Sequence, residues 1–395
     1  MRNTIIPFTM TEYMLRDLLT IKNGRDHKDL ADGKYPVYGS GGIMRYVNAY
    51  LYDKPSILLP RKGSLSNIQF CETPFWTVDT TYYTEINETL CEPYYLYRYL
   101  TLLNLASFDS GSTVPSMTFD SYYHQKVLLP SLSEQKRASK VLRNIDNKIQ
   151  LNEQINRNLE ELARLIYDYW FVQFDFPGKN GKPYKTSGGK MVYNDQLKRE
   201  IPAGWEVGNL YAVAEYINGL ACQNNRPQKG EKALPVIKIR EMSDGITPDT
   251  EEVSENIPSK YIVENGDILF SWSATLMVMI WAGGKGGLNQ HIFKVVPKDR
   301  FPKSFAYQLL SDYVVNFQQI ALSRKTTMGH ITSDHISLSR VVLPPENVLK
   351  QYAEKIDPII EKIVQNQMEF QKLTILRDHL LPLLMNGQVS VSNLP

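Results

Sequence analysis

The chain has 395 residues, 43% of them hydrophobic and 22% charged, which is the composition of a folded protein with two or three domains. No stretch reaches about 18 apolar residues, and the start of the chain lacks a signal-peptide pattern, so membrane spanning and secretion are not expected. The net charge of +2 neither requires nor excludes a nucleic-acid partner, because such binding depends on a local positive surface.

The three cysteines are far apart in the sequence and form no C-x-x-C spacing. They support neither a disulfide framework nor a structural zinc site. This cysteine usage fits a reducing cytoplasm, which is the location we expect for the protein.

The first half of the chain divides into a globular part and a helical part. Residues 1–130 contain short runs rich in Val, Ile and Tyr, bounded by Gly and Pro, which predict short strands with a few helices. Residues 131–175 carry apolar side chains at alternating spacings of three and four, Leu162 among them, and contain no glycine. This pattern predicts a long helix with a coiled-coil seam, from about Ser133 to Trp170.

The second half repeats this division after a connector. Residues 176–204 contain several Gly, Pro and Lys residues, which predict a surface connector. Residues 205–344 have the character of the first globular part, and residues 345–388 show the helical spacing again and end at the Asn386-Gly387 cap signal. The sequence therefore predicts an α+β fold with two similar globular parts and two long helices.

An internal repeat links the two halves. Leu128-Leu129-Pro130 recurs 214 residues later as Val342-Leu343-Pro344, and the same offset continues without a gap along the two predicted helices. The looser matches upstream pair Asn23-Gly24 with Asn218-Gly219, Pro36-Val37 with Pro235-Val236, and Ile57-Leu58-Leu59 with Ile268-Leu269-Phe270. Their common order and spacing indicate two copies of one unit.

Catalytic signatures are missing from the sequence. It has no G-x-x-x-x-G-K-[ST] loop for ATP hydrolysis, and no Asn or Asp followed by Pro-Pro-aromatic, as a methyltransferase would need. The six histidines form no H-E-x-x-H pair, so no metal ligand is predicted. Glu134-Gln135-Lys136 has a nuclease-like E-x-K order, but its place in the first turn of a helix favours a stabilising charge there. No catalytic residue is predicted.

Basic and polar side chains gather after the paired apolar strands of the two repeats. Such donors contact phosphates and base edges in DNA, whereas the alternative is a pair of solvated loops. The predicted DNA-binding residues are Arg61, Lys62, Ser64, Asn67, Lys238, Arg240, Trp272, Ser273 and Lys325.

The order of these features resembles that of the specificity subunits of type I restriction-modification enzymes, and the likeness covers nearly the whole chain. The segments that carry it are Gly111–Met117 with Lys325–Ile331, Pro130–Lys136, Asn152–Asn156, Phe174–Tyr184 and Ile201–Glu206. The first repeat departs from the pattern, because it lacks the Pro-Ala-Gly-Trp segment found at residues 202–205.

The resemblance implies two target-recognition domains, 1–130 and 205–344, each reading one half of a split double-stranded DNA sequence. It implies that the two helices pack antiparallel and relate the two domains by a pseudo-twofold repeat. It also implies that the helices bind two methyltransferase subunits, and that restriction subunits join through the resulting complex. The chain itself would be a non-catalytic subunit without a cofactor, while S-adenosylmethionine, ATP and Mg²⁺ would bind to the partners. The alternatives are a self-contained DNA-modifying or cleaving enzyme with an unrecognised site, and a coiled-coil scaffold that binds only protein.

Apolar residues off the helix seam are the candidates for covering by the methyltransferase subunits, because a single helix pair leaves apolar surface exposed. The alternative is that these side chains pack against the globular parts of the chain. The predicted partner-binding residues are Leu151, Leu165, Tyr167, Phe171, Ile375 and Leu381.

Two asparagines mark the midpoints of the predicted helices. Asn152 and Asn366 are separated by the repeat offset, so a pseudo-twofold axis would place them opposite each other as a buried amide pair. That pair would fix the register of a helical spacer roughly 60 Å long, if about 40 residues rise 1.5 Å each.

Overall fold

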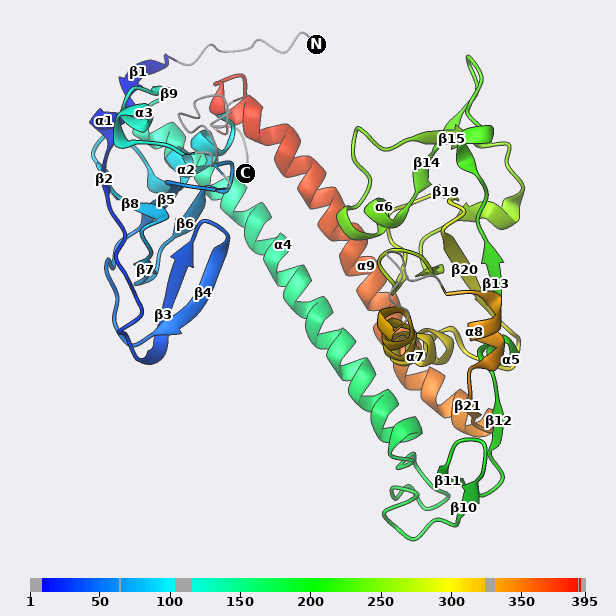
Figure 1. Ribbon diagram of the computed structural model, residues 1–395. Helices are drawn as coiled ribbons and strands as arrows, with labels where there is room; N and C mark the ends of the chain where they lie inside the picture. Colours follow the sequence, from blue (N-terminus) through cyan, green and yellow to red (C-terminus); the bar gives the residue numbers. More distant parts are fainter. Residues whose placement is uncertain (1–8, 64, 104–115, 324–330, 390, 392–395) are drawn as a thin grey trace. The chain divides into compact units, whose positions relative to one another are not determined.

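The computed structural model describes residues 9–63, 65–103, 116–323, 331–389 and 391 (Figure 1). Its contacts divide the chain into unit 1, comprising Met1–Lys148 and Leu373–Pro395, and unit 2, comprising Ile149–Lys372. Each of the two long helices contributes residues to both units: α4 spans Leu132–Tyr167 and α9 spans Glu346–Met385.

Unit 1 contains a four-stranded sheet in the order β2-β8-β5-β6, a three-stranded sheet in the order β4-β3-β7, and the pair β1-β9. All residues of β5 are buried, as expected for a short, continuous apolar run. The elements are β1 (Thr11–Met14), α1 (Leu15–Leu18), β2 (Leu19–Lys22), β3 (Asp32–Gly39), β4 (Gly42–Val47), β5 (Ser56–Pro60), β6 (Gln69–Cys71), β7 (Trp76–Thr77), β8 (Thr81–Ile86), α2 (Pro93–Thr101), α3 (Phe119–Tyr123) and β9 (Lys126–Leu129).

The core of unit 1 joins the sheet to both long helices. Ile57 of β5 and Tyr95 of α2 belong to the same buried cluster as Leu142 of α4 and Leu384 of α9. The Tyr95 hydroxyl donates a hydrogen bond to the carbonyl oxygen of Leu384 at 3.3 Å. The last turns of α9 are therefore part of the first globular core.

Unit 2 contains two four-stranded sheets, in the orders β13-β20-β17-β18 and β15-β14-β19-β16, and the pairs β10-β11 and β12-β21. Its elements after α4 are η2 (Asp168–Val172), β10 (Met191–Asn194), β11 (Arg199–Pro202), β12 (Glu206–Gly208), α5 (Leu210–Val213), β13 (Ala214–Asn218), η3 (Cys222–Asn224), β14 (Ala233–Ile237), α6 (Ile239–Asp244), β15 (Glu252–Ser254), η4 (Ser259–Tyr261), β16 (Ile262–Val263), β17 (Ile268–Ser271), β18 (Met277–Ile280), β19 (Gly286–Leu288), β20 (Ile292–Pro297), α7 (Lys303–Ser323), α8 (Ser333–Leu338) and β21 (Val341–Leu343).

The connector between the repeats is more ordered than its composition predicts. It contains the β10-β11 hairpin, and Phe176 stacks on Tyr184 with ring centroids 4.6 Å apart. Phe176 also lies 4.9 Å from Trp205, so these aromatic rings tie the connector to the core of unit 2. The Gly and Pro content indicated the turns but not these aromatic contacts.

The strand order of the two sheets demonstrates the internal repeat. The order β2-β8-β5-β6 in unit 1 matches β13-β20-β17-β18 in unit 2, and the parallel pair β3-β7 matches β14-β19. The predicted equivalents Ile57 and Ile268 lie in the matching strands β5 and β17, and Val37 and Val236 lie in the parallel pairs. The predicted α+β fold with two similar parts and two long helices is confirmed.

The long helices run antiparallel, because rising residue numbers on α4 meet falling numbers on α9. In unit 2, Asn152 Nδ2 donates to Glu369 Oε2 at 2.9 Å, and Asn156 Nδ2 donates to the Ile363 carbonyl oxygen at 3.1 Å. In unit 1, Asp146 of α4 contacts Arg377 of α9.

The register of the helix pair differs from the predicted one. Asn152 and Asn366 are both buried, but Asn366 Nδ2 donates to Asn156 Oδ1 at 2.9 Å, which replaces the predicted pair of Asn152 with Asn366. The contact is shifted by about one helical turn. In a perfect repeat, the pair of Asn366 with Asn156 would have a counterpart in which Asn152 pairs with the residue 214 positions after Asn156. That residue is Phe370, which has no side-chain amide, and Asn152 pairs with the Glu369 carboxylate instead.

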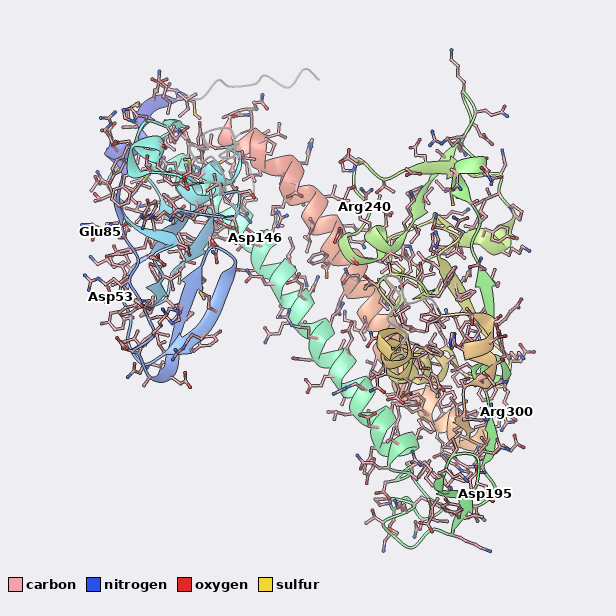
Figure 2. The ribbon with its side chains drawn as sticks, viewed as in Figure 1. Asp53, Glu85, Asp146, Asp195, Arg240 and Arg300 are labelled. Atoms are coloured by element: carbon pink, nitrogen blue, oxygen red, sulfur yellow. The ribbon has the colours of Figure 1, made fainter. Side chains whose placement is uncertain are left out.

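Asp146 of α4, which is labelled in Figure 2, makes side-chain contacts with α2 and α9 within unit 1. Its carboxylate accepts hydrogen bonds from the Tyr94 hydroxyl and the Arg98 guanidinium of α2, and Arg377 Nη1 of α9 lies 3.4 Å from Asp146 Oδ1. The exposed fractions of the Arg98 and Asp146 side chains are 12% and 13%. Burial acts to lower the pKa of Arg98, but the hydrogen bonds and charge interactions with Asp146 and Tyr94 outweigh it and raise that pKa, so the Arg98 guanidinium is charged.

The three cysteines are buried and unpaired. Burial raises the pKa of Cys91 to about 12 and that of Cys222 to about 11. Within the described part of the chain, no helix combines the length and apolar character needed to cross a membrane.

Candidate nucleic-acid interface

The central strand of each repeat ends in an equivalent group of loops, which we call the loop cluster. In unit 1 it comprises Tyr38–Met44, Arg61–Lys62 and Val78–Thr81, and in unit 2 it comprises Ile237–Arg240, Trp272–Ser273 and Asn289–Ile292. These segments lie at the carboxyl ends of β3, β5 and β7 in unit 1 and of β14, β17 and β19 in unit 2, and some include the last residues of that strand or the first residues of the next element.

Five main-chain hydrogen bonds recur around the two loop clusters. Val78 N donates to Tyr38 O at 3.0 Å, and Asn289 N donates to Ile237 O at 3.2 Å. The other four bonds of unit 1 run from Thr81 N to Val78 O (3.0 Å), Arg61 N to Thr80 O (2.9 Å), Met117 N to Arg61 O (3.0 Å) and Arg25 N to Thr77 O (2.8 Å). Their counterparts in unit 2, in the same order, run from Ile292 N to Asn289 O (3.0 Å), Trp272 N to His291 O (3.3 Å), Ile331 N to Trp272 O (2.9 Å) and Leu220 N to Leu288 O (3.0 Å). Arg61 and Trp272, both predicted from the sequence, are therefore structural equivalents.

In unit 1, the structure brings Arg61 and Lys62 to the surface of the loop cluster directly after β5. The Arg61 guanidinium lies 5.9 Å from the Tyr82 ring centroid, and the Lys62 side chain is exposed and forms no ion pair with any described residue. Asn67 Nδ2 donates to the Ser40 carbonyl oxygen at 2.6 Å, so this amide supports the tip of the β3-β4 hairpin. Ser64 lies outside the described residues.

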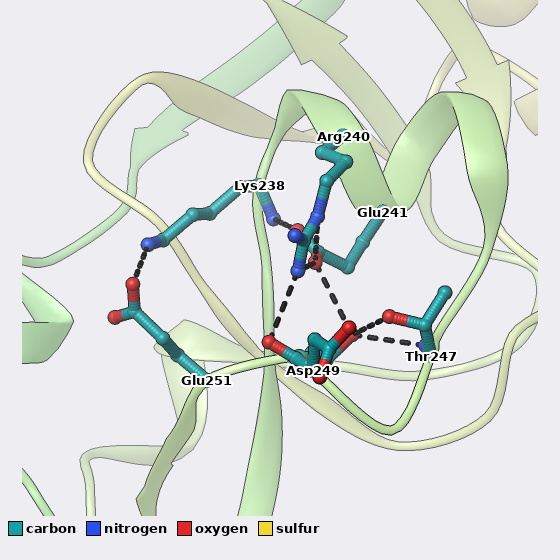
Figure 3. Close-up of polar contacts among 7 residues, drawn as sticks. Lys238, Arg240, Glu241, Thr247, Asp249 and Glu251 are labelled. Atoms are coloured by element: carbon teal, nitrogen blue, oxygen red, sulfur yellow. Dashed lines mark hydrogen bonds and ion pairs between the residues drawn. The ribbon is translucent and has the colours of Figure 1, made fainter. Parts of the chain in front are cut away.

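In unit 2, the predicted cations Lys238 and Arg240 are held by acidic partners (Figure 3). Lys238 Nζ donates to Glu251 Oε1 at 2.5 Å, and this hydrogen bond lowers the pKa of Glu251. Arg240 Nε and Nη2 both donate to Oε1 of Glu241, at 3.0 and 2.8 Å, and Nη2 also donates to the carbonyl oxygen of Asp249 at 3.2 Å. The Arg240 guanidinium is thus fixed in place while its side chain stays half-exposed.

Trp272 and Ser273 differ in what they offer to a ligand. The Trp272 ring is partly exposed, its Nε1 donates to Asn218 Oδ1 at 3.0 Å, and it lies 5.5 Å from the His291 ring. Ser273 has only 5% of its surface exposed, so its side chain faces inward and its contact with DNA stays a prediction that this burial does not favour. The strand pattern placed both residues after β17 but did not reveal that the chain turns Ser273 inward. Lys325 lies outside the described residues.

Two residues that the sequence analysis missed belong to the loop clusters. Asp79 lies in unit 1, where it lines a surface groove together with His27, Thr80 and the Gly39–Met44 segment. Gln290 occupies the equivalent position in unit 2. The offset of 211 residues between Ile57 and Ile268, applied to Asp79, would have identified Gln290.

The predicted partner-binding residues fall into two groups. Leu151, Leu165 and Ile375 are exposed, with 50%, 54% and 70% of their surfaces accessible. Tyr167, Phe171 and Leu381 are buried, at 3%, 6% and 7%. The first two pack in the core of unit 2 and Leu381 in the core of unit 1, as the alternative interpretation expected, so their binding to a partner stays a prediction without an exposed side chain to support it.

A second row of apolar side chains lies on the exposed face of α4 and η2. Its spacings of eleven, three, four and three, each close to a whole number of helical turns, place its members on one side of the helix. The row consists of Leu151, Leu162, Leu165, Tyr169 and Val172, all at least 39% exposed. Leu162, expected on the buried seam, therefore belongs to this exposed row.

The described residues contain no group of three or more His, Cys, Asp or Glu side chains that could hold a metal ion. The loop clusters instead offer cations, amides, a carboxylate and aromatic rings near the surface. This mixture suits DNA, since cations contact phosphates and amides contact base edges.

Comparison with known proteins gives consistent matches over most of the chain. Residues 7–161 and 202–373 match the family model of the type I restriction modification DNA specificity domain. The chain is 25% identical over 390 residues to the type I restriction enzyme MjaIX specificity subunit of Methanocaldococcus jannaschii, covering 93% of this chain and 86% of that protein. It is 24% identical over 337 residues to the HindI specificity subunit of Haemophilus influenzae, covering 72% and 73% of the two chains.

A solved structure has the same fold. The type I restriction-modification system S subunit from M. genitalium matches with a TM-score of 0.67 and 13% sequence identity, and the match covers 97% of both chains.

Proposed function

The chain belongs to the family of the type I restriction modification DNA specificity domain, and from this premise we propose that each of its two repeats reads one half of a bipartite double-stranded DNA target. As a specificity subunit, the chain recognises the DNA target and is itself non-catalytic. The observation that carries the proposal is the recurrence of the same five main-chain hydrogen bonds around two loop clusters with different side chains. Equivalent loops with different side chains suit two readers of different sequences.

Within each loop cluster, we assign the cations to the phosphates. Lys62 has an exposed ammonium group without an internal partner among the described residues, whereas Lys238 would have to exchange Glu251 for a phosphate. Arg61, Arg240 and Trp272 complete the proposed surface. The phosphate contacts would set the affinity and its salt dependence, and the other side chains would set the sequence preference.

The salt dependence of DNA binding tests this assignment. We expect the complex of the chain with its methyltransferase subunits to lose affinity for target DNA steeply as salt rises, because each phosphate contact releases counterions. Lys62→Ala should make the slope of log K against log salt shallower by about 0.9. Lys126→Ala, which removes an equal charge from β9, is the control and should leave the slope unchanged. Binding that does not depend on salt would instead support the protein-only scaffold.

We further propose that two methyltransferase subunits bind the chain and that restriction subunits join through the complex. S-adenosylmethionine, ATP and Mg²⁺ would be bound by these partners, and the assembly would act on DNA in the cytoplasm. The exposed row on α4 supports a protein partner, because its 3-4 spacing suits packing against another helix.

Leu165 provides a test of this partner surface. We expect Leu165→Glu to weaken binding of the methyltransferase by at least about tenfold, since it places a charge in an apolar contact, a change of about 1.4 kcal/mol or more. The chain should remain folded, because 54% of Leu165 is exposed. Ile246→Glu, at a site 42% exposed outside the long helices, is the control. Equal affinities of the two variants in a titration would exclude Leu165 from the interface.

A further inference from the structure

One short turn has the same main-chain contacts in both repeats. In unit 1, Thr81 N donates to Val78 O at 3.0 Å and so closes the turn across Asp79 and Thr80. In unit 2, Ile292 N donates to Asn289 O at 3.0 Å and closes the turn across Gln290 and His291. The hydrogen bonds from Val78 N and Asn289 N to the neighbouring strands β3 and β14, described above, anchor each turn. The backbone at positions 79 and 290 is therefore fixed in the same way.

The residues around these two positions are buried, but the side chains at the positions themselves are not. Val78 and Thr81 are 7% and 1% exposed in unit 1, and Asn289 and Ile292 are 6% and 0% exposed in unit 2. The Asp79 side chain is exposed, and its carboxylate has no hydrogen-bond partner among the described residues. A rigid backbone with an uncommitted polar side chain is a suitable geometry for reading a ligand.

The amide of Gln290 is nearly as uncommitted as this carboxylate. Gln290 is half-buried, and its Nε2 lies 3.4 Å from Nε2 of His291, the one side-chain hydrogen bond that it makes with the described residues. That long contact leaves the carbonyl oxygen of the amide, and at least one of its hydrogens, available to a ligand.

The chemistry of the two side chains indicates different ligands. A carboxylate is repelled by phosphates, so at a DNA surface it is useful only where a base offers a donor, and the N4 amino group of cytosine is such a donor in the major groove. A carboxamide can pair with N6 and N7 of adenine through two hydrogen bonds. Arg61 and Lys62 lie next to Asp79, because both donate main-chain hydrogen bonds to Thr80 O and the Arg61 guanidinium donates to Asp79 O at 3.3 Å. Their positive charges would contact phosphates and so allow the Asp79 carboxylate to approach DNA.

We propose that positions 79 and 290 are the equivalent base-reading positions of the two repeats, with Asp79 accepting a hydrogen bond from cytosine and Gln290 pairing with adenine. This inference rests on the proposed function. It adds the identity of one base that each repeat reads in its half of the target.

Methylome sequencing of cells that express the chain with its methyltransferase tests the inference. The wild-type chain should produce a bipartite methylated motif, and the absence of such a motif would refute the proposed function itself. Asp79→Ala should relax the motif at one C·G pair in one half, and Gln290→Ala at one A·T pair in the other half. The expected loss of discrimination at that pair is roughly 5- to 150-fold. Asp53→Ala and Gln319→Ala, exposed residues outside the loop clusters, are the matched controls.

Each outcome decides the inference separately from the proposed function. The half of the motif that a variant does not read serves as an internal control for folding and assembly. A bipartite motif that is identical in wild type and variants would overturn the inference and leave the proposed function intact. Complete loss of methylation would also overturn it, because a residue that reads one base pair should not abolish activity at every site.

Discussion

Replacing Gly24 with alanine should disrupt the loop cluster of the first repeat, and Gly219→Ala should do the same in the second. A Cβ atom at Gly24 would lie 2.1 Å from the carbonyl oxygen of Val78, and one at Gly219 would lie 2.1 Å from that of Asn289. Both oxygens belong to main chain that is fixed by hydrogen bonds, so no side-chain rotation can relieve the clash. We expect each variant to lose about 3 kcal/mol of unfolding free energy in urea titrations.

The same two variants should also weaken target binding by at least about tenfold, because the main chain that must move carries Asp79 or Gln290. Gly41→Ala is the control for stability, since a Cβ atom there would meet no atom within 4 Å; it is not a control for binding, because Gly41 lies in the loop cluster. If the Gly24 and Gly219 variants unfold at the same urea concentration as Gly41→Ala, the backbone of these turns is not rigid.

Asp146→Ala should cause a large loss of stability in unit 1. It leaves the charged Arg98 guanidinium, with 12% of its side chain exposed, without its carboxylate, and it removes a partner from Arg377 and Tyr94. Removing one member of a buried ion pair costs about 3 kcal/mol or more. For a unit of this size the melting temperature should fall by roughly 6 to 12 °C.

Differential scanning calorimetry of the Asp146→Ala chain measures this effect, and Asp53→Ala supplies the control, since Asp53 is exposed and carries the same charge. A shift no larger than that of the control would mean that the contacts of Arg98 and Arg377 with Asp146 contribute little net stability.

The repeat and the long helices could be predicted from the sequence because both depend on apolar periodicity. The 3-4 spacing on α4 and α9 identifies helices that bury one face. The runs around Ile57 and Ile268 identify strands buried on both sides, and in the structure they form β5 and β17. These patterns follow from burial, which any sequence must satisfy to fold.

The helix register and the side-chain directions in the loops could not be predicted in the same way. Asn156 takes the place expected for Asn152 because a shift of one helical turn keeps an apolar seam buried, so periodicity alone does not choose between the two registers. Ser273 faces inward although it follows a strand beside an exposed neighbour, because the local turn sets its direction. The sequence spacing also could not assign Leu162 to the exposed row. The apolar residues of the buried seam and those of the neighbouring exposed face of α4 both recur every three or four residues, so the spacing fits either face.

The five recurring hydrogen bonds have a consequence for how the protein can evolve. They join main-chain atoms only, which every residue except proline can provide as donors, so mutation of the side chains in the turn leaves the scaffold in place. Exposed substitutions usually change stability by about 0.5 kcal/mol or less, so selection on such a position is not opposed by unfolding. If positions 79 and 290 read bases as proposed, a single substitution at either would change one base pair of the target and leave the fold unchanged, so the target could diverge between relatives faster than the fold.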